Sequence, residues 1–123
     1  MLGEYTGFAN GEYQINPEPY PVPLLSIDNE DHHRMREEAQ QTGSIYVNNV
    51  VLDHAETGFS TYFAGAGHMN FTDLPLISPV LANALGTGEI DPAECTDRLN
   101  SLILSFFDCY LKDQGNFSIT EQN

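Results

Sequence analysis

Two short stretches of almost continuous apolar residues predict buried strands. The first covers residues 22–27, V-P-L-L-S-I, at the end of a proline-rich segment, residues 16–23, that excludes a helix and keeps the chain extended. The second, F-S-T-Y-F-A at residues 59–64, is rich in aromatic residues and only partly alternating. Such runs are typical of strands that are covered on both faces, as in a parallel sheet.

Four other segments carry the signals of helices. They are residues 34–41, 45–55, 79–85 and 92–112. Ser78 and Pro79 begin the third of them with an N-cap and a proline at the first helical position, and Gly86 ends it. The last begins with a capping box whose cap residue is Asp91, and an apolar stripe follows as far as Lys112.

The order of these elements is strand, helix, helix, strand, loop, helix, helix. Two buried strands joined by a helical crossover form a βαβ unit, which is right-handed in nearly all proteins. We therefore predict a partial α/β domain over residues 1–123, in which residues 1–20 are an irregular lead-in and residues 21–123 hold the strands and helices. Ligands of such folds bind at the carboxyl ends of the strands, which directs attention to residues 28–33 and 65–73.

Composition and charge narrow the classes of partner. The chain has 123 residues, of which 41% are hydrophobic, so it is long enough for one domain with a core. It has no apolar run of membrane length, and we expect no stable membrane insertion. Eighteen acidic and four basic residues give a net charge of -14, which predicts repulsion of nucleic acids and anionic membrane surfaces. The sequence does not indicate a compartment.

The two cysteines are not expected to form a disulfide with each other. Cys95 and Cys109 lie in the same predicted helix, about 21 Å apart along its axis at a rise of 1.5 Å per residue. A disulfide requires α-carbons within about 7 Å. Neither cysteine has the spacing of a zinc ligand, so the sequence predicts two free thiols.

His68 is the first candidate for chemistry. It follows the second predicted strand in G-A-G-H-M-N-F-T-D-L-P, residues 65–75. The glycines before it let the backbone bend sharply and bring the ring over a neighbouring strand end. A histidine in such a turn acts as a general base or is an ordinary structural residue, and the residues alone leave both interpretations open.

The second candidate is D-N-E-D-H-H, residues 28–33, which we interpret as an acidic polar loop. Three hypotheses compete here: a metal site, a solvated loop whose acids start a helix, and an acid that orients the imidazole of His68. The segment lacks the glycine and the distant glutamate of an EF-hand loop. Ser78 is better explained as an N-cap than as a nucleophile, and the sequence contains no G-x-S-x-G, P-loop or G-x-G-x-x-G motif.

Four segments resemble the C-terminal third of α/β-hydrolase esterases. They are P-V-P-L-L-S-I-D-N-E-D, G-A-G-H-M-N-F-T-D-L-P-L-I-S-P, L-G-T-G-E-I-D-P-A-E-C and N-S-L-I-L-S-F-F-D-C-Y-L-K, at residues 21–31, 65–79, 85–95 and 100–112. They are most similar to bacterial proteins related to platelet-activating-factor acetylhydrolase and to dienelactone-hydrolase-like lipases. The resemblance implies a mostly parallel sheet and ester hydrolysis by a Ser, Asp, His triad. It implies that His68 is the triad base and that no metal or organic cofactor is needed.

The same resemblance implies that the serine elbow, the oxyanion-hole loop and the first five or six strands lie upstream of Met1. We therefore expect a C-terminal segment of a carboxylic-ester hydrolase that is inactive alone and meets its ester substrate only in the complete enzyme. The triad acid is expected upstream, at the end of the sixth strand, or alternatively at Asp28 or Glu30. An unpaired strand edge, where the sixth strand would pair, predicts self-association. The alternative function is a non-catalytic acidic interaction module on a hydrolase-derived scaffold.

Overall fold

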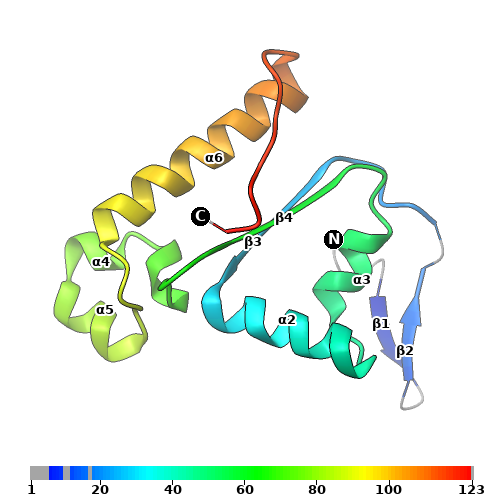
Figure 1. Ribbon diagram of the computed structural model, residues 1–123, viewed down its shortest axis with the longest axis horizontal. Helices are drawn as coiled ribbons and strands as arrows, with labels where there is room; N and C mark the ends of the chain where they lie inside the picture. Colours follow the sequence, from blue (N-terminus) through cyan, green and yellow to red (C-terminus); the bar gives the residue numbers. More distant parts are fainter. Residues whose placement is uncertain (1–5, 10–11, 17, 123) are drawn as a thin grey trace. The chain divides into compact units, whose positions relative to one another are not determined.

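The computed structural model describes residues 6–9, 12–16 and 18–122 (Figure 1). Its elements in chain order are β1 (Thr6–Ala9), β2 (Glu12–Ile15), β3 (Leu24–Asn29), α2 (Glu30–Thr42), α3 (Val47–Asp53), β4 (Gly58–Phe63), the 3-10 helix η1 (His68–Phe71), α4 (Leu74–Ile77), α5 (Pro79–Leu85) and α6 (Pro92–Lys112). No helix among the described residues is both long and apolar enough to cross a membrane.

The chain divides into two compact units. The first comprises residues 1–26 and 34–60, and the second comprises residues 27–33 and 61–123. Both parallel strands contribute residues to both units.

The strands β3 and β4 pair in parallel, as the βαβ interpretation predicts. Their direction follows from two backbone hydrogen bonds. Near their beginnings the Leu24 N–H donates to the Thr57 carbonyl at 2.9 Å, and after their ends the Glu30 N–H donates to the Ala66 carbonyl at 3.2 Å. Both partners advance along the chain together, which only a parallel pair allows. The fold is thus α/β, two parallel strands with flanking helices, as expected of the C-terminal portion of an α/β-hydrolase.

The N-terminal segment differs from the predicted irregular lead-in. Residues 6–9 and 12–15 form two antiparallel strands, β1 and β2, in a register that pairs Thr6 with Ile15 and Ala9 with Glu12. Residues 1–5, 10–11 and 17 of the lead-in lie outside the described residues. The intervening sequence is Asn-Gly, the dipeptide most typical of two-residue hairpin connections. The prediction of an irregular lead-in did not take this hairpin signal into account.

In the first unit, a buried arginine joins α2 to the strands. Arg36 is 5% exposed, and its guanidinium donates hydrogen bonds to the hydroxyls of Ser26 on β3, at 2.9 Å, and Ser60 on β4. The helix extends beyond the predicted residues 34–41 at its start, because residues 28–33 were interpreted as a polar loop. Val51 of α3, 2% exposed, supplies a buried apolar side chain of this unit.

In the second unit, the core lies where η1 and α6 meet the end of β4. Phe63, Ala66 and Cys95 are buried at its centre, and five partly buried apolar residues pack against them: Ile27, Phe71, Ile90, Leu99 and Leu102. The two last helices have the predicted bounds. Asp91 caps α6 as expected, because its Oδ1 accepts the Glu94 N–H at 2.9 Å, whereas Ser78 stands at the N-cap of α5 without a side-chain capping bond.

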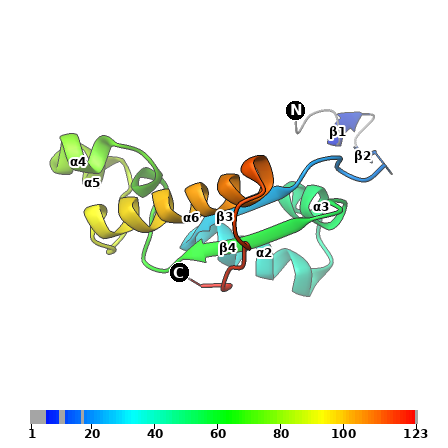
Figure 2. The ribbon, with the colours of Figure 1, turned by 90° about the horizontal axis from the view of Figure 1, so that it is seen from above.

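The C-terminal tail closes one side of β4. After α6 it turns back, and the Tyr62 N–H donates to the Glu121 carbonyl at 2.9 Å (Figure 2). The buried Thr61 hydroxyl donates to the Thr120 carbonyl at 2.8 Å. These bonds satisfy backbone groups that an edge strand otherwise exposes. Within the described residues β4 is the one strand that pairs with β3, so the other side of β3 is the open edge of this sheet.

Candidate functional site

Both polar segments singled out in the sequence lie at the carboxyl ends of the parallel strands, but the first is not a loop. Asp28 and Asn29 end β3, and Glu30 is already the first residue of α2. Asn29 explains the early start of the helix, because its Oδ1 accepts the His32 N–H at 2.8 Å as an N-cap side chain does. Glu30 and Asp31 add negative charge to the first turn, where the helix dipole favours it.

Glu30 braces the turn that follows β4. Its Oε2 accepts the Gly65 N–H at 2.7 Å, and its own N–H donates to the Ala66 carbonyl at 3.2 Å. Gly65 adopts a φ of 72°, in the left-handed region that favours glycine, so the chain reverses sharply here. These two bonds hold the start of α2 against the segment that leads to His68.

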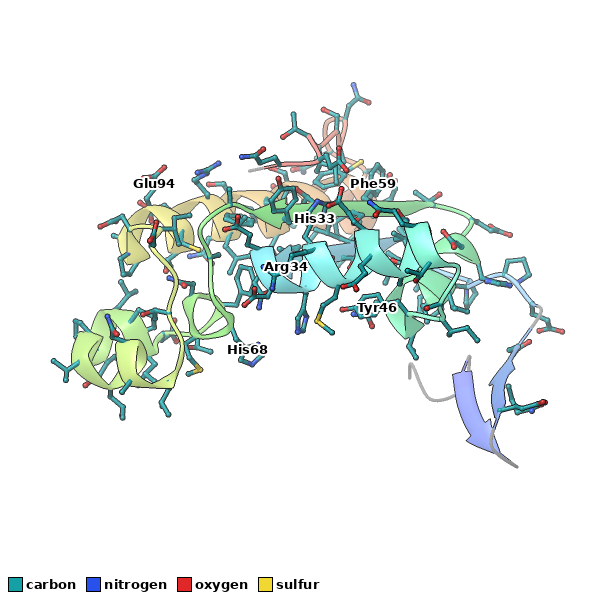
Figure 3. All side chains as sticks on the ribbon, turned by 60° about the horizontal axis from the view of Figure 1, so that its bottom comes forward. His33, Arg34, Tyr46, Phe59, His68 and Glu94 are labelled. Carbon is teal, nitrogen blue, oxygen red and sulfur yellow. The ribbon has the colours of Figure 1, made fainter. Side chains whose placement is uncertain are left out.

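His68 is the exposed first residue of η1 (Figure 3). Its ring faces that of His32 on the first turn of α2, with centroids 6.4 Å apart and planes tilted by 45°. Among the described residues, the structure records no hydrogen bond from the His68 ring to Asp28 or Glu30. The imidazole is therefore accessible at the strand ends, with a second histidine as its neighbour.

The two candidate acids have different surroundings. Asp28 is 4% exposed at the end of β3, whereas Glu30 is exposed and its carboxylate accepts the Gly65 N–H. Glu30 thus contacts the backbone three residues before His68. His32 is the neighbour that the sequence analysis did not connect with His68, because the contact depends on the early start of α2.

The η1 turn is anchored to the core beneath it. The Phe71 ring packs edge-on against Phe63, with centroids 5.9 Å apart and planes at 84°. The Asn70 side chain is 2% exposed and accepts the N–H groups of Gly67 and Gly88. The polar and aromatic residues after His68 thus serve to fix the turn, a role that their order in the sequence did not indicate.

The thiol of Cys95 lies directly under this turn. It is fully buried, it donates to the Asn70 carbonyl with a 3.8 Å separation, and burial raises its pKa above the ordinary thiol range. A thiol in this state is a poor nucleophile. Cys109 is half-buried, and both cysteines are free.

The raised pKa of Cys95 predicts a loss of stability at alkaline pH. The folded protein keeps the thiol proton where the unfolded chain has lost it, so the free energy of unfolding falls as pH rises above about 8.5. Urea unfolding at pH 7 and pH 10 measures this loss. We expect a smaller loss in Cys95→Ala than in the parent, and a parent-like loss in the control Cys109→Ala. Equal losses in the parent and Cys95→Ala would contradict the prediction.

No group of three or more His, Cys, Asp or Glu side chains in the described part of the chain has an arrangement that could hold a metal ion. The metal hypothesis for residues 28–33 therefore finds no support in the geometry. Their side chains cap α2, brace the Gly65 turn and approach His68.

The chain matches the model of a known protein family. The model of the family described as platelet-activating factor acetylhydrolase, isoform II, matches residues 13–122. Neither the curated proteins nor the solved structures contain a significant match to the chain. The matched region includes both parallel strands, the His68 turn and the helices α2 to α6.

Proposed function

Because the chain belongs to the platelet-activating factor acetylhydrolase, isoform II, family, we propose that it supplies His68 as the general base of a serine ester hydrolase. Membership in this family indicates that the chain derives from a hydrolase. The finer assignment, in which His68 belongs to a Ser, Asp, His triad, is our proposal. In that role the imidazole takes the proton of the serine hydroxyl and returns it to the leaving alcohol.

The observation that best supports this proposal is the position of His68. It is exposed, it lies on a turn that other residues hold in place, and it falls within the residues that match the family model. His68 lies at the carboxyl end of the parallel strands, where α/β folds place their catalytic loops. The turn before it is held by Glu30, and the turn after it by Phe71. A general base needs both this access to a partner and a fixed position.

We propose that the triad acid comes from a preceding segment of the hydrolase, with Asp28 as the alternative within this chain. A triad acid is typically buried, and Asp28 is 4% exposed at the adjacent strand end. Glu30 fits this role less well, because its carboxylate accepts the Gly65 N–H. We therefore assign Glu30 to bracing the turn. The proposed reaction needs no metal or organic cofactor.

The chain alone is expected to lack esterase activity. Its 123 residues contain no G-x-S-x-G elbow, and an imidazole without its serine contributes little, because triad residues act as a unit. We expect hydrolysis of a short-chain nitrophenyl ester at the rate of free imidazole at the same concentration. Faster turnover that His68→Ala abolishes would contradict this expectation.

The proposal itself is tested in a chimeric hydrolase, in which residues 13–122 replace the matching segment of a complete family member that carries the serine. We expect the chimera to hydrolyse the same ester. Circular dichroism and a cooperative thermal transition establish that it is folded. A folded chimera without turnover would contradict the proposal and favour the non-catalytic interaction module.

A further inference from the structure

A single side-chain oxygen joins two segments of the second unit around the candidate base. Asn70 Oδ1 accepts the N–H of Gly67, at 2.8 Å, and the N–H of Gly88, also at 2.8 Å. Gly67 immediately precedes His68, and Gly88 lies in the connection between α5 and α6. The bond from the Gly67 N–H is one of the two hydrogen bonds of a capping box at the start of η1. The other would need a side chain at Gly67, which glycine lacks.

The chemistry of the partners fixes the orientation of the Asn70 carboxamide. Both partners are N–H donors, so only the oxygen can face them. The Nδ2 atom is buried and has no hydrogen-bond partner among the described residues. The side chain therefore acts on the turn through its oxygen, while its backbone carbonyl accepts the Cys95 thiol of α6.

The two segments that this oxygen joins lie very close together. A Cβ atom on Gly67 would lie 2.7 Å from the Gly88 nitrogen. Backbone bonds flank the carboxamide on both sides, from the Met69 N–H to the Gly86 carbonyl at 3.2 Å and from the Ile90 N–H to the Gly65 carbonyl at 3.0 Å. Removal of the oxygen would leave two N–H groups in this tight contact without an acceptor, which is costly.

We propose that Asn70 is the positioning residue of His68, an inference that rests on the proposed function of that histidine. The His68 side chain is exposed, so the backbone of the four-residue η1 turn sets where its ring points. The Asn70 carboxamide holds that backbone to the Gly88 segment. A displacement of about 1 Å at a catalytic group can cost about 10²-fold in rate.

Hydrogen exchange of the 123-residue chain, followed by NMR, tests the structural part of the inference. In Asn70→Ala we expect the amide protons of Gly67 and Gly88 to exchange at least about tenfold faster than in the parent. Asn83→Ala, at an exposed position on α5, is the matched control and should leave both rates unchanged. Unchanged exchange in a folded Asn70→Ala would overturn the inference.

Kinetics of the chimeric hydrolase test the positioning role. We expect Asn70→Ala to lower kcat about 10²-fold and to leave KM within about threefold of the parent. In a His68→Ala background the same substitution should cause no further loss of kcat, because its effect passes through the imidazole. Equal losses in the two backgrounds, or no loss in either, would overturn the inference.

Asn70→Asp and His68→Ala distinguish failure of this inference from failure of the proposed function. Asn70→Asp keeps an oxygen for both N–H groups, and we expect its kcat to stay within about tenfold of the parent. A loss of about 10²-fold or more in Asn70→Asp would contradict positioning through the oxygen, and this criterion does not require the alanine variant to fold. An unchanged kcat in His68→Ala would instead remove the proposed function, and this inference with it.

Discussion

Replacement of His68 by alanine is expected to lower kcat of the chimeric hydrolase by about 10⁴-fold or more. In the proposed triad, loss of the imidazole leaves the serine hydroxyl without a base to accept its proton and the leaving alcohol without an acid to protonate it. Binding of the ester does not require the ring, so KM should change little. Initial rates with a short-chain nitrophenyl ester at saturating concentration measure the loss.

His32→Ala is the matched control for this experiment. It removes an exposed imidazole whose ring centroid is 6.4 Å from that of His68, on the first turn of α2. We expect its kcat to remain within a few-fold of the parent. If His32→Ala lost as much activity as His68→Ala, the base would be misassigned. If both variants were fully active, the catalytic role of this strand end would be refuted.

The elements that could be predicted from the sequence are those whose signals are local. Asp91 caps α6 through a residue three positions later, and Gly86 ends α5 with its own φ of 108°. The two buried strands are short apolar runs, visible without knowledge of their partners. The position of His68 at a strand end followed from the same order of elements, because parallel strands bring their carboxyl ends to one edge.

The features that could not be predicted depend on contacts between distant residues. The bond from the Gly65 N–H to Glu30 and the bond from the Gly88 N–H to Asn70 join residues that no spacing rule connects. Arg36 is buried because two serines on different strands face it, although an arginine alone predicts an exposed position. The family resemblance pointed to His68 as the base, but the residues that hold its turn emerged only from the folded backbone.

Substitution of Gly88 by alanine is expected to lower the free energy of unfolding of the second unit by about 3 kcal/mol. The added methyl group would overlap the Gly65 carbonyl oxygen and lie 2.6 Å from the Gly67 nitrogen. Both are backbone atoms, so no side-chain rotation relieves the contact. The segments must separate, which breaks the bonds from Gly88 to Asn70 and from Ile90 to Gly65. Urea unfolding of the 123-residue chain measures the change.

Gly115→Ala separates this steric cost from the ordinary cost of replacing a glycine. Gly115 has a φ of 73° and no atom within 4 Å of an added Cβ, so its substitution costs about 1 kcal/mol from backbone conformation alone. The loss of stability in Gly88→Ala beyond that in Gly115→Ala measures how closely the backbone at Gly88 approaches the segment before His68. If Gly88→Ala cost no more than Gly115→Ala, the segments could separate freely. The tight contact on which the proposed positioning of His68 depends would then be absent.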